Sequence, residues 1–299
     1  MNMKIKIAGI RRGNQYSPNH IGNDAAIFNK TVEFLINRNC EVTEYSEEEF
    51  QKSQIEEDII FNMARDVKSI QKLQQLEDTG KIVVNSGYGI ENCTREKMTR
   101  LLLANNIPHP RSLIVPTNDF QVYDFDSLGK QCWIKRGDFH AVLREDVTFA
   151  RTQEEAEHVI QEYALRGIPS AVVNEHLEGD LVKFYGIKGT DFFYWFYPSS
   201  TYHSKFGLEK INGDAVGISF DLDKLKEDCD RTAQVLGIHI YGGDCVVDKD
   251  SFVRIIDFND WPSFAPCRDA AAPFIAQCIY SVATQKNENL ELHHNEQSK

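Results

Sequence analysis

The stretch GGDCVVDKDSFVRIIDFNDWPS at residues 242–263 indicates two strands joined by a short acidic turn. If residues 248–251 form a four-residue loop, Asp257 lies diagonally across the hairpin from Asp244, on the same face. Asn259 shares that face because side chains repeat every second residue. Two carboxylates and an amide on one sheet face are oxygen ligands that suit Mg²⁺. The alternative is an acidic hairpin at a solvated sheet edge.

Strand and helix patterns alternate over the N-terminal residues 1–92. The expected strands cover residues 3–10, 41–46, 57–63 and 81–86, and the expected helices cover 24–39 and 65–80. Asn23 or Asp24 is the expected cap of the first helix. This alternation predicts a parallel sheet in an open α/β layer, which binds ligands beyond the carboxyl ends of its strands.

From about residue 93 the pattern is rich in strands. Helices are expected at 94–106, 152–167, 224–237 and 270–285, and strands at 111–116, 131–138, 141–151, 170–177, 181–189, 191–198, 241–247 and 252–260. The predicted fold class is therefore α/β (α+β). The predicted domains are an N-terminal parallel α/β domain (1–92), a central lid domain (93–170), a C-terminal antiparallel sheet domain (171–284) and a disordered polar tail (285–299).

The composition excludes several classes of protein. The 299 residues include 45 acidic and 33 basic side chains, a net charge of −12, which disfavours a nucleic-acid scaffold. No apolar run approaches the roughly 20 residues of a membrane helix. The seven cysteines are odd in number and lack C-x-x-C spacing, so we expect no disulfide framework or zinc site and a cytoplasmic location.

Two lysines and one strand end suggest a nucleotide site. Lys97 lies in the first turn of its expected helix and Lys135 ends an apolar strand, so either side chain could reach a phosphate. Residues 174–180 follow another apolar strand, where free backbone groups could bind an adenine and an acid could bind ribose. The alternatives are solvated surface lysines and a plain turn between strands.

Four segments in order resemble the ATP-grasp superfamily. They are VVNSGYGIENCTREKMTRLLLANNIPHPRSLIV (83–115), QCWIKRGD (131–138), AVVNEHLEGDLVKFYGI (171–187) and the hairpin at 242–263. They are similar to the entrance helix, second-lysine strand, adenine hinge and metal hairpin of RimK-type glutamate ligases, with D-alanine–D-alanine ligase and glutathione synthase as wider relatives. The resemblance covers residues 85–284, and the first 84 residues fit the α/β domain that usually precedes this fold.

The resemblance implies a role for particular residues. Lys97 and Lys135 would hold ATP phosphates, Asn174, Glu175 and Leu177 the adenine, Asp180 the ribose, Lys183 the transferred phosphate, and Asp244, Asp257 and Asn259 the metal. Because the loop after Lys135 has one glycine where relatives have several, His140 or Arg144 would help to hold the γ-phosphate. Gly242 and Gly243 stand where some relatives have an arginine. The substrate candidates are Arg11, Arg12, Asn23, Arg65 and the loop 199–219 with His203 and Lys205.

The implied activity is that of an ATP-dependent ligase that uses Mg²⁺, or Mn²⁺ in its place. It would convert a small-molecule or peptide carboxylate to an acylphosphate, which an amine (or thiol) then attacks. We expect no nucleic-acid or membrane partner, and the implied activity is compatible with a homo-oligomer. Two alternatives stay open: an ATP-grasp kinase of a phosphorylated polyol, favoured by His140 and the Asp257-Phe258-Asn259 order, and a non-catalytic nucleotide-binding protein. The charged loop 136–146 is expected to be loosely held until nucleotide binds.

Overall fold

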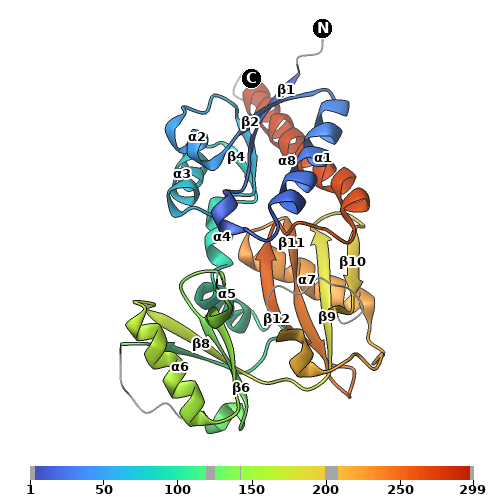
Figure 1. The fold of residues 1–299 in the computed structure, drawn as a ribbon. Helices are drawn as coiled ribbons and strands as arrows, with labels where there is room; N and C mark the ends of the chain where they lie inside the picture. The colour runs from blue at the N-terminus through green and yellow to red at the C-terminus, as the bar shows by residue number, and fades with distance from the viewer. Residues whose placement is uncertain (1–3, 119–124, 142, 199–207, 297–299) are drawn as a thin grey trace.

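The computed structural model describes residues 4–118, 125–141, 143–198 and 208–296, and these residues form three four-stranded sheets (Figure 1). One sheet is parallel and two are antiparallel, which confirms the predicted α/β (α+β) class. Figure 1 shows both ends of the chain at the same end of the molecule, beside the parallel sheet.

The N-terminal sheet has the order β2-β1-β3-β4, with parallel neighbours throughout. Its elements are β1 (Ile5–Ile10), α1 (Ile21–Asn37), β2 (Cys40–Tyr45), α2 (Glu47–Lys52), β3 (Ile59–Asn62), α3 (Val67–Asp78), β4 (Ile82–Val84) and α4 (Gly87–Asn92). Helices α2 and α4 were not predicted, because six residues are too few to show a helical period. The predicted cap was wrong: α1 begins at Ile21, so Asn23 and Asp24 lie inside its first turn.

The central sheet has the order β5-β8-β6-β7 and is antiparallel. Its elements are α5 (Arg95–Ala104), β5 (Ser112–Pro116), β6 (Cys132–Arg136), β7 (Val147–Ala150), α6 (Gln153–Leu165) and β8 (Ser170–Glu175). The strand predicted at 141–151 forms only over β7. A 3-10 turn precedes it, in which the buried Asp146 carboxylate pairs with Arg136 and Arg166. These ion pairs tie Asp146 to the end of β6 and to the residue that follows α6.

The C-terminal sheet has the order β10-β9-β11-β12 and is antiparallel. Its elements are β9 (Asp180–Ile187), β10 (Phe193–Phe196), α7 (Leu222–Leu236), β11 (Ile240–Val247) and β12 (Val253–Asp260). Helix α7 packs on one face of this sheet through a core that includes Phe184, Cys229, Leu236 and Phe258. The other face is therefore left for side chains that point toward the central sheet.

The last helix, α8 (Arg268–Glu296), returns to the N-terminal sheet and packs beside α1 (Figure 1). Ile27 and Leu35 share one buried core with Ile275 and Ile279. The prediction of a disordered tail from residue 285 was wrong up to Glu296. Residues 285–296 contain no glycine or proline, and extending an existing helix is far easier than nucleating one.

The register of the β11–β12 hairpin differs from the predicted one. Val247 pairs with Val253, so the turn covers residues 248–252 rather than 248–251. The pairing shifts by one residue between Cys245 and Asp244, which leaves Ile256 without a partner on β11. This β-bulge brings Asp257 directly opposite Asp244 instead of diagonal to it.

The N-terminal and C-terminal sheets are joined by the buried side chain of Asn85, which follows β4. Its Oδ1 atom accepts hydrogen bonds from the backbone N–H groups of His239 (2.8 Å) and Ile240 (2.9 Å). Its Nδ2 atom donates to the carbonyl of Ile240 at 2.7 Å. One amide therefore satisfies three backbone groups at the start of β11.

Replacing Asn85 by alanine should lower the free energy of unfolding by about 3 kcal/mol or more, because each buried polar group left unpaired costs about 1–3 kcal/mol. Urea unfolding measures this change. Asn105→Ala is the matched control, since the exposed Asn105 amide donates only to the carbonyl of Leu101 within its own helix. Equal stabilities of the two variants would contradict the bridging role of Asn85.

Candidate active site

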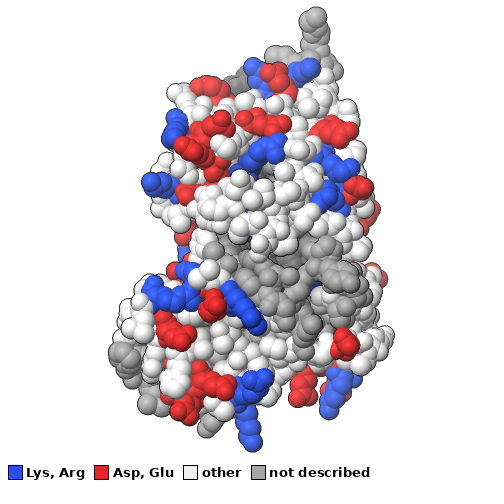
Figure 2. All heavy atoms as spheres, viewed as in Figure 1, with Lys and Arg blue, Asp and Glu red and all other residues white. Residues whose placement is uncertain are grey.

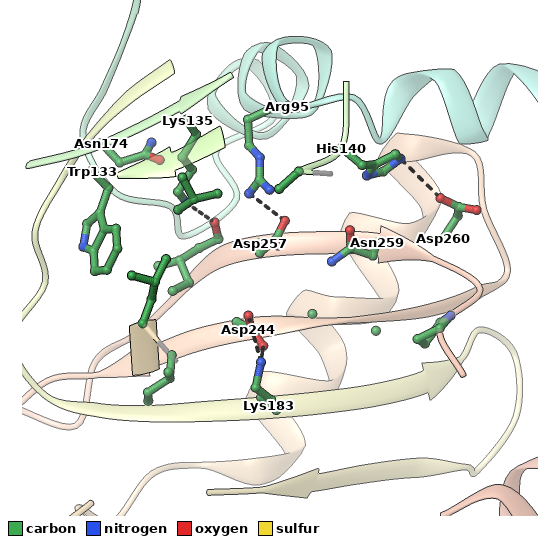
Figure 3. A pocket seen from close by; sticks show the side chains of 18 of the residues that line it. Arg95, Trp133, Lys135, His140, Asn174, Lys183, Asp244, Asp257, Asn259 and Asp260 are labelled. Atoms are coloured by element: carbon green, nitrogen blue, oxygen red, sulfur yellow. Dashed lines mark hydrogen bonds and ion pairs between the residues drawn. The ribbon is translucent and has the colours of Figure 1, made fainter. Parts of the chain in front are cut away.

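A cavity of about 370 Å³ lies between the central and C-terminal sheets. Strands β6 and β8 line one side and strands β9, β11 and β12 line the other, while loops of the N-terminal domain close one end. Figure 3 shows side chains from both sheets pointing into this space.

The floor of the cavity is a row of charged residues across three strands. Lys183 on β9 pairs in register with Asp244 on β11, and Asp244 pairs with Asp257 on β12. Because side chains alternate along a strand, Phe184 and Phe258 point the other way, into the core beneath α7. The sheet thus separates an apolar face from a charged one.

Each carboxylate of this row has a cation beside it (Figure 3). Lys183 Nζ lies 3.1 Å from Asp244 Oδ1, and Arg95 Nη1 lies 2.9 Å from Asp257 Oδ1. Lys135 Nζ, also buried, donates to the carbonyl of Ile256 at 3.0 Å. Like charges directly opposite each other destabilise a strand pair, so these cations are what allow the two carboxylates to face each other.

The environment of Asp257 keeps its carboxylate charged. Burial acts to raise the pKa of Asp257, but Arg95, Lys135, a hydrogen bond from Asn259 and Lys183 together lower it below the usual value. For Lys135 the balance is the reverse. Burial, reinforced by Arg95, lowers the pKa of Lys135 to about 7, although Asp257 and Asp244 act in the opposite sense.

The donor set at the row fits a hard cation only in part. Asp244, Asp257 and Asn259 supply two carboxylates and an amide on one face, a set of oxygen donors that suits Mg²⁺. No group of three or more His, Cys, Asp and Glu side chains in the described part of the chain could hold a metal ion. A magnesium ion here would therefore take its remaining ligands from water and phosphate oxygens.

One end of the cavity is apolar. It is lined by Trp133 from the central sheet and by Leu177, Leu181, Val246 and Ile256. An apolar lining of this kind suits the apolar part of a small ligand.

Polar groups border this apolar end. Asn174 lines the cavity, and its Nδ2 atom donates to Ser112 Oγ at 2.6 Å. Glu175 lies at the cavity edge and pairs with Arg111 at 2.7 Å. The structure therefore brings Asn174, Glu175 and Leu177 to the cavity as the resemblance implied.

The opposite end carries charges of both signs, from all three domains. Arg65, which follows β3, lies 2.6 Å from the carboxylate of the buried Asp260, and both contact His140 from the loop after β6. Arg12 pairs with Asp24 at 3.3 Å and donates to the carbonyl of Trp261 at 2.8 Å.

Several predicted residues lie elsewhere. Arg11 pairs with Glu44, Asn23 accepts from Arg268, and Arg144 does not line the cavity. The Asp180 carboxylate accepts hydrogen bonds from the backbone N–H groups of residues 216–218, so it ties down that segment, and Asp180 does not line the cavity. His203 and Lys205 lie outside the described residues.

The basic residue of α5 that faces the cavity is Arg95, not Lys97. Residues two positions apart on a helix, such as Arg95 and Lys97, are rotated by about 200° relative to each other. Only one of the two can therefore point to the cavity. Arg95 is buried against Asp257, whereas Lys97 is half-exposed and pairs with Glu91 at 2.5 Å. The position of Arg95 directly after the cap residue Thr94 was the available signal.

The surface adds little to this site. Figure 2 shows acidic and basic side chains interspersed on the face in view, with neither sign dominant. Among the described residues, no helix has the length and apolar character needed to span a membrane.

If Arg95 rather than Lys97 holds the triphosphate, Arg95→Ala should weaken ATP binding by about 1.5–3 kcal/mol, the usual worth of a charge-assisted hydrogen bond. Lys97→Ala, on the same helix, is the control and should bind ATP as the wild type does. Calorimetric titration of each variant with ATP measures the difference. The reverse order of the two affinities would restore the role first assigned to Lys97.

If the cavity binds a nucleotide, the lowered pKa of Lys135 predicts proton uptake on binding. Phosphate favours the charged amine, so the pKa of Lys135 in the complex should exceed 7, and ATP affinity should decrease as the pH rises from 7 toward about 9. Calorimetry at pH 8 in two buffers of different ionisation enthalpy measures the protons taken up. Lys135→Met should abolish the uptake; unchanged uptake in that variant would assign it to another group.

Comparisons with known proteins support the fold. No family model and no curated protein sequence matches the chain. Among solved structures, D-alanine–D-alanine ligase from Bacillus anthracis in complex with ATP has a TM-score of 0.69 at 12% identity, over 95% of this chain and 99% of that one. The D-alanine–D-alanine ligase from Coxiella burnetii has a TM-score of 0.67 at 12% identity, over 99% and 100% of the two chains. The ATP-grasp ligase PsnB in complex with precursor peptide and AMPPNP has a TM-score of 0.60 at 18% identity, over 95% and 100%. The chain therefore has the ATP-grasp fold.

Proposed function

We propose that this protein is an ATP-dependent ligase that phosphorylates a carboxylate and joins it to an amine. The observation that carries the proposal is the charged row Lys183–Asp244–Asp257 with Arg95 and Lys135 above it. Three cations around two carboxylates suit a triphosphate together with a divalent ion. The row lies between an apolar slot for the base and a mixed-charge end for the substrates.

The roles of the residues follow from this order. The base would occupy the slot at Trp133 and Leu177, and Lys135, Arg95 and Lys183 would hold the phosphates. Asp244, Asp257 and Asn259 would hold magnesium, which would neutralise negative charge on the phosphate oxygens. These residues position and neutralise the reacting groups, so no covalent nucleophile on the protein is required.

The acceptor end would bind the two substrates. Arg65 and Arg12 can bind a carboxylate or phosphate, and Asp260 and Asp24 can bind an ammonium group. In the proposed reaction a carboxylate oxygen attacks the γ-phosphorus and ADP leaves; the amine then displaces phosphate from the acylphosphate and loses a proton. Similar folds belong to a D-alanine–D-alanine ligase and to a ligase seen with a precursor peptide, so small and peptide carboxylates are both candidates.

A kinase acting on a phosphorylated polyol is the second candidate. It is favoured by His140, which faces the same end as Arg65, and by the order Asp257, Phe258, Asn259 on β12. A kinase would leave the transferred phosphate on the product, whereas a ligase would release it.

The deciding experiment measures ADP and free phosphate together, with pools of carboxylates, amines and phosphorylated polyols. A ligase should release both products in equal amounts, and only when a carboxylate and an amine are present. ADP release with a polyol phosphate and without free phosphate would identify a kinase. Nucleotide binding without ADP release from any pool would contradict both activities.

Replacing the carboxylates of the row should abolish turnover without unfolding the protein. Asp244→Asn and Asp257→Asn each remove one of the two charged ligands for magnesium, while the amide that replaces it keeps the size of the side chain. ADP release should fall to background in both variants, each of which should remain folded and unfold cooperatively on heating. Wild-type turnover in either variant would refute the metal role of that residue.

A further inference from the structure

The bulge in β12 decides where Asp257 points. Cys245 pairs with Ile255, and a regular ladder would continue by pairing Gly243 with Asp257. In that register Asp257 would lie on the opposite face from Asp244, because a slip of one residue reverses every side chain. The extra residue Ile256 restores the shared face.

The bulge is held from outside its own sheet. Strand β12 lies at the edge of the C-terminal sheet, so one side of its backbone faces the central domain. There the N–H of Ile255 donates to the carbonyl of Pro108 at 2.9 Å. The carbonyl of Ile255 accepts from His109 Nδ1 at 2.7 Å, and the carbonyl of Ile256 accepts from Lys135 Nζ at 3.0 Å.

His109 is suited to this contact by its neighbours. Pro108 and Pro110 flank it and have no backbone N–H, so they cannot donate to the exposed edge of β12. The imidazole supplies the missing donor, and since a carbonyl can only accept, Nδ1 carries the proton. Burial is the main cause that lowers the pKa of His109, to about 4, so the ring stays neutral near pH 7.

The second ring nitrogen takes no part. Nε2 of His109 is buried and has no hydrogen-bond partner among the described residues. His109 does not line the cavity, and its contact is with the backbone that precedes Asp257. Its effect on the site must therefore act through that backbone.

We propose that His109 is a positioning residue: it holds the bulge in β12 and so keeps Asp257 on the same face as Asp244, where the pair can bind a divalent ion. The proposal rests on the proposed function for the identity of the ligand. Groups beyond the direct ligands of a metal change its affinity by about 10–100-fold when they are altered.

The test compares three variants of the full chain. His109→Leu removes the donor, and His109→Gln keeps an amide N–H that can donate to Ile255. His239→Leu is the matched control. Burial also lowers the pKa of His239, and one of its ring nitrogens is buried without a hydrogen-bond partner among the described residues. His239 lies just before β11, at the other end of the hairpin from its turn. Binding of Mn²⁺ is measured by electron paramagnetic resonance with a non-hydrolysable ATP analogue present, and hydrogen exchange is followed over residues 253–260.

His109→Leu should raise the Mn²⁺ concentration for half-saturation by about tenfold or more. It should also speed exchange over residues 253–260, while His109→Gln and His239→Leu should stay near the wild type in both measurements. Wild-type behaviour of His109→Leu, or equal effects of His109→Leu and His239→Leu, would overturn the proposal. If wild-type protein binds no Mn²⁺ with the nucleotide, the proposed function fails, and the exchange comparison still decides whether His109 holds the bulge.

Discussion

The site depends on two carboxylates that face each other directly across the β11–β12 hairpin. Asp244 and Asp257 would repel each other in an isolated hairpin. The structure places Lys183 beside one and Arg95 beside the other, each from a different element. Because Arg95 belongs to α5, neutralising the hairpin also fixes the start of the central domain against the C-terminal sheet. The same charges that hold these parts together are those that a triphosphate and a divalent ion would use.

The charged side chains of the row are already paired with one another. A bound nucleotide would therefore have to replace some of these partners. Arg95 would turn from Asp257 toward phosphate, and Asp257 would be released to a metal ion. Lys135 donates to the carbonyl oxygen of Ile256, an uncharged acceptor that a phosphate oxygen could replace. A divalent ion bound with the nucleotide would offset part of the negative charge that the phosphates bring, and the cations of the row would offset the rest.

The sequence predicted the fold class, the parallel first sheet and the antiparallel C-terminal sheet. Its errors occur where tertiary contacts decide. The position of Arg95 directly after Thr94 is a weak local signal, and it is the cavity that separates Arg95 from Lys97, since only one side of α5 faces it. Asp180 was assigned to ribose because it follows the hinge, but its carboxylate bonds to the backbone of residues 216–218. The hairpin register was missed because the bulge is set by contacts from Pro108 and His109, more than 140 residues away in the chain.

The cations at the mixed-charge end of the cavity also depend on contacts between distant elements. Gly242 lines the cavity, but a Cβ atom there would lie 2.6 Å from the ring of Tyr185 and 2.8 Å from Pro262, so no side chain can be accommodated. A cation at this end of the cavity comes from another element instead: Arg65, which follows β3, pairs with Asp260. His140 of the central domain joins the same pair. The mixed-charge end of the cavity therefore takes its lining from all three parts of the chain, so its geometry depends on the contacts among them.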